Sequence, residues 1–350
     1  MAYSSIVKPG DYFNTVTYSG NSSTNNITGV GFQPDWVWMK RRDQTAWHYL
    51  NDAVSGVRET IFSNDSNAQV DKTTGLTAFG TDGFTLGSEG DINENGGTYV
   101  SWNWKANGAG SSNTDGNVTT TVSANTTAGF SIINYTGTGS NSSTMGHGLG
   151  TTPAMIMIKK LDTSSDWRVW HQNLSATTGK NLRLNYDNAE DSNNSFFYSS
   201  APNATTFNPG DGGNTNSNGG TYRAFVFKET TGYSRFGYYM GNGNANGTFI
   251  YTGFKPAFYI IKRKDSTGSW IIKDTKRPGL NQNGTYLVAD TNIAEATGSG
   301  NLATDEYSNG FKMRGTSSAI NASGGTYIYM AFAEEPLVAN VGQSIPATAR

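Results

Sequence analysis

Five residues, Asn95-Gly-Gly-Thr-Tyr99, decide how this sequence folds, because the same five return at Asn218 to Tyr222. A near copy, Ser-Gly-Gly-Thr-Tyr, occupies Ser323 to Tyr327. Each occurrence stands directly before a run of alternating residues that is typical of a half-buried β-strand. The Gly-Gly-Thr-Tyr segment therefore marks the same point in three copies of one unit.

Other landmarks repeat in the same order around this segment. Each copy contains Tyr-x-Gly, a Pro-led apolar run that ends in Lys, a Trp (Trp47, Trp167 and Trp270) and a late Phe. Equivalent landmarks lie 103 to 123 residues apart, whereas solenoid repeats are only about 20 to 50 residues long. The pattern predicts three tandem domains over residues 1–112, 113–231 and 232–350, the last with a polar C-terminal tail.

The composition favours an all-β protein. Gly accounts for 43 of the 350 residues, and Asn, Ser, Thr and Gly fill the gaps between short apolar runs. These residues favour turns, so the texture suits many short strands rather than helices. We expect each domain to be an antiparallel β-sandwich.

Charge and cysteine content exclude several classes of protein. The net charge is −2, so no basic field attracts nucleic acid. Cys is absent, which excludes disulfides and thiolate metal sites. The N-terminal residues lack the pattern of a signal peptide, and no apolar stretch is as long as a membrane span. We expect neither a nucleic-acid nor a membrane partner.

The strand after each glycine pair has a defined inner face. Val100, Trp102 and Trp104 share one face of the first such strand. In the second copy Arg223 takes the position of Val100, which predicts a location near a sheet rim. The glycines supply a positive φ or a bulge where a loop enters the strand. This structural use is favoured over contact between the glycine backbone and a ligand.

The Pro-led strands have apolar residues on both faces, which predicts a strand covered on both sides. We expect their closing lysines (Lys40, Lys159 and Lys262) where each strand reaches the surface. Arg41 and Arg263 follow two of these lysines. Such short basic clusters are usually solvated strand ends, and binding of an anionic glycan or phosphate is the alternative.

Taken together, the Tyr-x-Gly, Gly-Phe-x-Pro-led and Gly-Gly-Thr-Tyr motifs resemble those of a family of repeated jelly-roll domains, concanavalin-like or laminin-G-like, in tailed bacteriophages, many of them marine. The likeness covers nearly the whole chain. It implies a tail-fibre or other virion structural protein, made in the host cytoplasm and assembled as a homo-oligomer with other virion proteins. No catalytic motif of that family carries over, so we expect no enzyme activity.

One stretch offers a catalytic alternative. Glu89, Asp91 and Glu94 resemble the E-x-D-x-x-E signature of jelly-roll glycoside hydrolases of the laminarinase and agarase kind. A retaining pair of carboxylates must lie about 5–5.5 Å apart, and in a regular strand Glu89 and Glu94 would face opposite ways. The stretch also runs directly into an Asn-Gly-Gly turn, so a loop is favoured. We expect no cofactor; calcium held by loop oxygens stays open, with no ligands assigned.

Exposed aromatic rings are the better functional lead, because a ring can cover the apolar face of a sugar. The candidates are Trp47, Trp167, Trp270, Tyr233, Tyr238 and Tyr239. Core packing is the favoured interpretation, because all three copies keep the tryptophan. The sequence thus suggests a virion protein that binds host surface glycans. The alternative is a purely structural capsid or tail decoration without a ligand.

Overall fold

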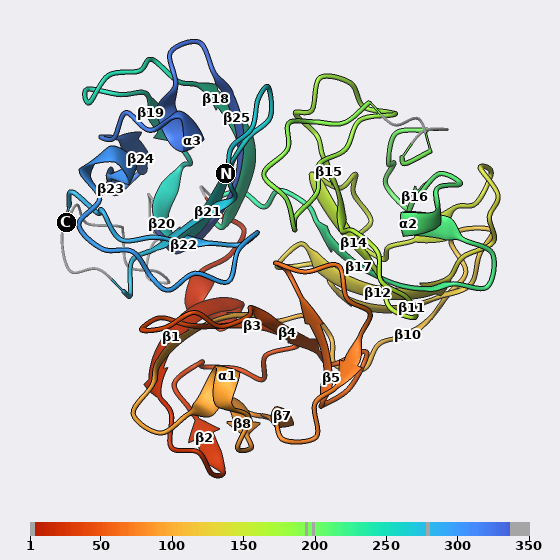
Figure 1. Cartoon of the computed structure of the whole chain (residues 1–350). Coiled ribbons are helices and arrows are strands. Elements are labelled where there is room, and N and C mark those ends of the chain that lie inside the picture. Colours follow the sequence, from red (N-terminus) through yellow and green to blue (C-terminus); the bar gives the residue numbers. More distant parts are fainter. Residues whose placement is uncertain (1–3, 193–194, 198–199, 278–280, 337–350) are drawn as a thin grey trace.

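The computed structural model describes residues 4–192, 195–197, 200–277 and 281–336. The ladders between its strands are antiparallel, and within these residues the α-helices are single turns: α1 (Gly90–Asn93), α2 (Gly213–Asn216) and α3 (Ser318–Asn321). The expected all-β class is confirmed (Figure 1). The polar tail expected after Pro336 lies outside the described residues.

The first copy forms a larger sheet in the order β1-β9-β3-β4-β5-β6 and a smaller one in the order β2-β8-β7. A 3-10 turn, η1 (Pro9–Asp11), precedes them. The strands are β1 (Phe13–Ser19), β2 (Asn25–Ile27), β3 (Trp36–Arg41), β4 (Tyr49–Asp52), β5 (Glu59–Phe62), β6 (Val70–Asp71), β7 (Leu76–Gly80), β8 (Gly83–Leu86) and β9 (Thr98–Trp104).

The second copy forms sheets in the orders β10-β11-β12-β17-β14-β15 and β13-β16. Its strands are β10 (Ser111–Asn113), β11 (Thr120–Asn125), β12 (Phe130–Thr136), β13 (Met145–Gly146), β14 (Met155–Lys160), β15 (Arg168–His171), β16 (Thr206–Phe207) and β17 (Thr221–Phe227). Strand β10 spans the expected boundary at residues 112 and 113 and pairs with β11.

The third copy forms sheets in the orders β18-β25-β20-β21-β22 and β19-β24-β23. Its elements are β18 (Ser234–Met240), β19 (Phe249–Tyr251), β20 (Phe254–Arg263), β21 (Ile271–Asp274), β22 (Leu287–Val288), η2 (Gly300–Leu302), β23 (Thr304–Tyr307), β24 (Gly310–Met313) and β25 (Thr326–Pro336). Four strands have the same order in all three larger sheets: β1-β9-β3-β4, β12-β17-β14-β15 and β18-β25-β20-β21.

The Gly-Gly-Thr-Tyr segment connects a single-turn helix to a central strand of each larger sheet. Its first glycine has a φ of 77° at Gly96, 76° at Gly219 and 72° at Gly324, a region that favours glycine. The hydroxyl of Tyr99 accepts from the N–H of Glu94 and donates to the carbonyl of Gly90, so it holds both ends of α1. The architectural role predicted for the glycine pair is confirmed.

The helix, the segment and the first strand of each copy are joined by equivalent contacts. Tyrosine rings stack with centroids about 5 Å apart in the pairs Tyr18–Tyr99, Tyr135–Tyr222 and Tyr239–Tyr327. The last residue of each helix is a buried asparagine: Asn93, Asn216 and Asn321. Its amide group donates to two loop carbonyls, which for Asn321 are those of Asn244 and Gly315. These asparagines therefore stabilise the fold in all three copies, because they hold the loops next to each helix.

The predicted faces of the central strands are confirmed. Val100, Trp102 and Trp104 are buried together in one core cluster. The prediction for Arg223 is wrong, because its side chain is 1% exposed and forms an ion pair with Asp52 of the first copy. An arginine at this position is buried because a carboxylate from the neighbouring copy faces it.

The inner faces of the three larger sheets meet in one core (Figure 1). The ring centroids of Trp36 and Phe225 lie 4.4 Å apart, and those of Phe13 and Phe332 lie 5.2 Å apart. Phe227 and Phe332 lie 6.0 Å apart and complete the contact between the second and third copies. The copies therefore share one aromatic core, while the first and third copies each also have a core cluster of their own.

Hydrogen bonds join the copies in a closed ring. Equivalent side chains lie near carbonyl oxygens of the adjacent copy: Trp167 Nε1 and Phe62 O (2.7 Å), Trp270 Nε1 and Arg183 O (2.8 Å), and His48 Nε2 and Val288 O (3.0 Å). Equivalent backbone bonds run from the N–H groups of Ser165, Gly268 and Ala46 to the carbonyls of Ser66, Asp187 and Asn292. The second copy contacts the first, the third contacts the second, and the first contacts the third.

The expectation that the closing lysines reach the surface is wrong, because Lys40, Lys159 and Lys262 are fully buried. The ammonium group of Lys159 donates to the carbonyl of Ser66 in the first copy, and that of Lys262 donates to Asp187 in the second. Carbonyl oxygens thus replace water around these charges, from the adjacent copy for Lys159 and Lys262 and from Arg41 of the same copy for Lys40. Burial lowers the pKa of each of the three lysines to about 8.

Candidate functional site

The tryptophans predicted as ligand-binding rings are mostly interior residues. Trp167 and Trp270 are buried and donate their indole N–H groups across the copy interfaces. Core packing, the interpretation that the sequence favours, is confirmed for these two residues, so neither offers an exposed ring to a ligand; the indole fills the space between two copies. Sequence spacing could not show this, since the acceptor of Trp167 lies 105 residues away.

Trp47 differs from the other two tryptophans. The first-copy residue equivalent to Trp167 is His48, whose Nδ1 accepts the indole N–H of Trp38 and whose Nε2 faces Val288. Burial lowers the pKa of His48, which keeps the ring neutral. Trp47 is half-buried and packs edge-on against Phe62, with centroids 4.7 Å apart.

Arg41 and Arg263 occupy equivalent positions and are engaged internally. Arg41 pairs with Asp43 at 3.1 Å and also with Glu94, while Arg263 pairs with Asp265 at 3.0 Å. Hydrogen bonding to Asp43 raises the pKa of Arg41 above its usual value. Their role as ligand residues stays a prediction, since a ligand anion would have to compete with these carboxylates.

Glu89, Asp91 and Glu94 lie around the single turn of α1. The hydroxyl of Tyr49 donates to Glu89 at 2.9 Å and to Asp91 at 3.1 Å, whereas Glu94 pairs with Arg41. The loop placement favoured by the sequence is confirmed, because Glu89 and Glu94 flank the helix rather than a strand. Among the described residues, no group of three or more His, Asp or Glu side chains is arranged to hold a metal ion.

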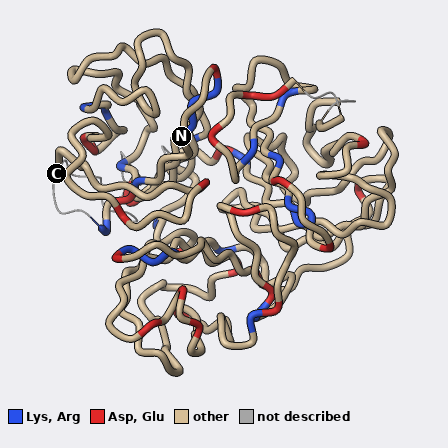
Figure 2. Tube along the Cα trace, in the orientation of Figure 1, with Lys and Arg blue, Asp and Glu red and all other residues tan. Residues whose placement is uncertain are grey.

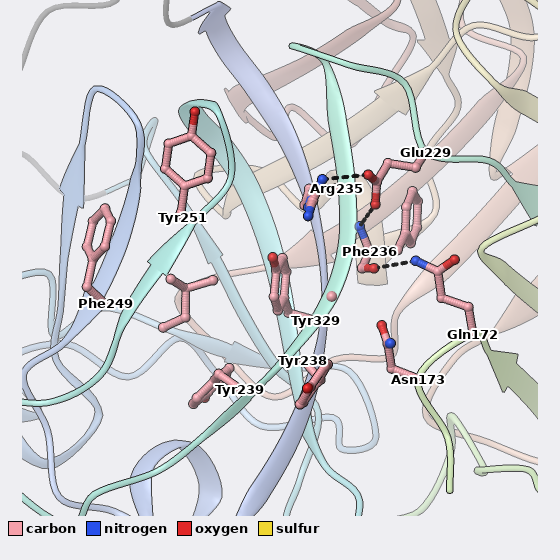
Figure 3. A pocket seen from close by; sticks show the side chains of 12 residues that line it. Gln172, Asn173, Glu229, Arg235, Phe236, Tyr238, Tyr239, Phe249, Tyr251 and Tyr329 are labelled. Carbon is pink, nitrogen blue, oxygen red and sulfur yellow. Dashed lines mark hydrogen bonds and ion pairs between the residues drawn. The ribbon is translucent and has the colours of Figure 1, made fainter. Parts of the chain in front are cut away.

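Of the exposed aromatic residues in the described part of the chain, all but Tyr186 lie in the third copy beside β18, and β18 is an edge strand of its sheet. A groove of about 390 Å³ lies there, and we call it the β18 groove (Figure 3). Tyr238, Phe249 and Tyr251 line it and are 61%, 43% and 56% exposed. Of the tyrosine candidates, Tyr238 is exposed, whereas Tyr233 and Tyr239 are buried, as the core-packing interpretation predicts.

The floor of the β18 groove is formed by a tyrosine over a glycine. A Cβ atom at Gly237 would come within 2.5 Å of the hydroxyl of Tyr329, so only glycine leaves room for this ring. Burial raises the pKa of Tyr329 to about 12. The side chain of Arg235 already hydrogen-bonds to this hydroxyl.

Polar side chains from the second copy and the connecting segment line the opposite wall (Figure 3). Gln172 donates to the carbonyl of Phe236 at 2.6 Å, and Glu229 accepts from the N–H of the same residue at 3.4 Å. Glu229 also pairs with Arg235 at 2.7 Å. The groove thus combines exposed rings with hydrogen-bonding groups, the usual composition of a binding site.

Comparison with known proteins places the chain in a family but adds no activity. Residues 8–336 match the model of a domain of unknown function, DUF7483. No curated protein and no solved structure matches the chain. None of the helices in the described part is long and apolar enough to cross a membrane. Because the match covers most of its length, the chain belongs to the DUF7483 family.

Proposed function

We propose that this chain is a non-enzymatic structural protein of a tailed-phage virion, either a tail fibre or a surface decoration. It would consist of three tandem jelly-roll domains of the concanavalin or laminin-G-like kind, and assemble as a homo-oligomer with other virion proteins. The resemblance of its motifs to phage proteins supports the virion context. The fold supports the structural role.

The observation that carries the proposal is the closed ring of contacts. Trp167, Trp270 and His48 each contact a backbone carbonyl of another copy, and buried lysines do the same. A body closed in this way resists separation of its parts, because each copy is held on two sides. Such rigidity suits a component of a particle.

The charge distribution supports partners other than nucleic acid. Figure 2 shows Lys and Arg spread among Asp and Glu over much of the trace, and no large region that is basic alone stands out. Nucleic-acid binding needs a clustered basic surface to displace counterions from phosphates. Protein and glycan partners fit this surface better.

Association with particles tests the proposal. Phage particles that encode this chain would be purified by density gradient, then analysed by quantitative mass spectrometry and by electron microscopy with antibody labelling. We expect the chain to band with the particles at a fixed copy number and to be labelled at one location. Recovery of the chain only in the soluble fraction of the lysate would refute the proposal.

Binding of host surface glycans is a second candidate function, favoured by the exposed rings of Tyr238, Phe249 and Tyr251. A polysaccharide array would test it with the variant Tyr238→Ala. Tyr186→Ala is the matched control, because Tyr186 is an exposed tyrosine outside the groove. Glycan binding that is lost only with Tyr238→Ala would support this function, and binding unaffected by both variants would contradict it.

A further inference from the structure

The outer edge of β18 presents backbone groups away from its own sheet. The N–H of Gly241 donates to the carbonyl of Gly325, and that of Ala333 donates to the carbonyl of Tyr233. Hydrogen-bonded and non-bonded pairs alternate along an antiparallel ladder, so the odd-numbered residues of β18 bond to β25. The N–H and C=O groups of Phe236, Tyr238 and Met240 therefore point outward.

Side chains cover two of these three outward positions. Gln172 and Glu229 contact the backbone of Phe236, and Thr248 donates to the carbonyl of Met240 at 2.6 Å. Within the described part of the chain, no hydrogen bond reaches the backbone N–H or C=O of Tyr238. The outer edge of β18 is thus covered by side chains at Phe236 and Met240 and open at Tyr238.

The second copy shows what fits at this position. Strand β12 is equivalent to β18, and its outer edge is paired with β11. Ser123 lies opposite Ile132 and Thr121 lies opposite Asn134, the equivalents of Phe236 and Tyr238. In the second copy, the six-residue strand β11 therefore pairs antiparallel with β12, which is the equivalent of β18.

The side chains of β11 indicate what such a strand requires. Val122 lies opposite Ile133 and is buried in the shared core, whereas Thr121 is exposed. In the third copy the residue equivalent to Ile133 is Gly237, which the ring of Tyr329 covers. A strand added there would place its central apolar side chain opposite Gly237, beside the ring of Tyr329 and next to Phe249 and Tyr251.

We propose that β18 is an acceptor for an extended strand from another protein of the particle. The added strand runs antiparallel to β18, with a β-branched apolar residue opposite Gly237 and small polar residues opposite Phe236 and Tyr238. It displaces the side chains of Gln172 and Glu229 from the backbone of Phe236. The unpaired N–H and C=O of Tyr238 favour a polypeptide over a glycan, because a peptide supplies both complementary groups at strand spacing.

This inference rests on the proposed function only for the source of the added strand. Its test uses the isolated full-length chain, so failure to bind a strand and failure to find the chain in particles are separate results. The probe is a fluorescent synthetic peptide with the sequence of residues 117–127, which contains β11. Binding is measured by fluorescence anisotropy.

Two substitutions at Tyr238 distinguish the contribution of its backbone N–H to peptide binding from that of its ring. Tyr238→Ala removes the ring and keeps the N–H, whereas Tyr238→Pro removes both. Proline is tolerated on an edge strand where the N–H faces solvent, and circular dichroism would verify the fold. Loss of a backbone hydrogen bond predicts peptide binding about tenfold weaker in Tyr238→Pro than in Tyr238→Ala. Thr17→Pro, at the equivalent position of β1, is the control and leaves binding unchanged.

A third variant tests displacement of the covering side chains. Gln172→Ala removes the competitor for the carbonyl of Phe236, so the peptide binds more tightly than to the unaltered chain. Absence of peptide binding, equal binding by Tyr238→Pro and Tyr238→Ala, or weaker binding by Gln172→Ala would each overturn the proposal. Glycan binding that Tyr238→Ala abolishes, without peptide binding, would assign the groove to the glycan instead.

Discussion

The indole N–H of Trp167 donates to the backbone carbonyl of Phe62 at 2.7 Å, and so joins the second copy to the first. Trp270 makes the equivalent bond to Arg183, and His48 faces Val288 in the same way. A residue that resembles an exposed sugar-binding tryptophan in the sequence is thus part of the interface between copies. The following predictions concern this interface and the elements that support it.

Trp167→Phe should destabilise the protein more than Trp36→Phe. Both indoles are fully buried, but the N–H of Trp36 has no partner among the described residues, so its loss leaves only a cavity. Trp167→Phe also leaves the carbonyl of Phe62 without its donor, at an added cost of about 1–3 kcal/mol. Urea denaturation of the two variants would measure the difference, and equal losses would contradict this assignment.

Asp52→Asn should be strongly destabilising because it leaves the buried guanidinium of Arg223 without a counter-charge. The asparagine keeps an oxygen for the N–H groups of Val54 and Ser55. We expect a loss of about 3–5 kcal/mol, much of which is recovered when Arg223→Met is added. A double-mutant cycle would measure this coupling, and additive effects would show that the pair does not matter.

Asn321→Asp should weaken the connection between α3 and its loop. The amide of Asn321 donates to the carbonyls of Asn244 and Gly315, and a carboxylate would turn both contacts into repulsions. Each carbonyl left without a donor costs about 1–3 kcal/mol. Thermal unfolding would detect the change, with Asn95→Asp at an exposed position as the control. A similar shift in both variants would count against the proposed role.

Stability should increase with pH in mildly alkaline solution. The pKa of Lys262 is lowered from 10.5 to about 8 by burial, so between these values the unfolded chain binds more protons than the folded one. The free energy of unfolding therefore rises between about pH 8 and about pH 10.5, and Lys40 and Lys159 contribute in the same direction. Lys262→Met should make this slope shallower, while Lys8→Met, at an exposed site, should not. Parallel slopes for all three proteins, measured by urea denaturation, would refute the assignment.

Local features of the fold could be predicted from the sequence. The glycine pairs need a positive φ in any context, and the alternation of Val100, Trp102 and Trp104 shows one face of a strand wherever it packs. The apolar residues on both faces of the Pro-led strands likewise predicted their burial, which the structure confirms for β3.

The contacts between copies could not be predicted in this way. Lys159 is charged and lies near the end of its strand, which is typical of a surface residue, but its ammonium group donates to the carbonyl of Ser66 in the first copy and to that of Ser165 in its own copy. Arg223 is buried for a similar reason, since its partner Asp52 lies 171 residues away. Partners at such separations leave no periodic signal along the chain.

The β18 groove was only partly visible in the sequence. Tyr238 was a candidate for exposure, but Phe249 and Tyr251 lie in a short strand whose alternation does not reveal which face is open. The groove exists because the described part of the third copy has no strand equivalent to β11. In the second copy, β11 pairs with β12 and so covers the equivalent edge. The chain between β17 and β18 is short, which is the one signal that an added strand is missing there.

Differential scanning calorimetry of the full chain and of Trp270→Phe tests the central claim most directly. If three copies form one closed body with a shared core, the chain unfolds in a single transition whose calorimetric and van't Hoff enthalpies agree. The substitution, at the interface of the second and third copies, then lowers the midpoint of that one transition. Separate transitions, with the one for the first copy unmoved by Trp270→Phe, would contradict the account.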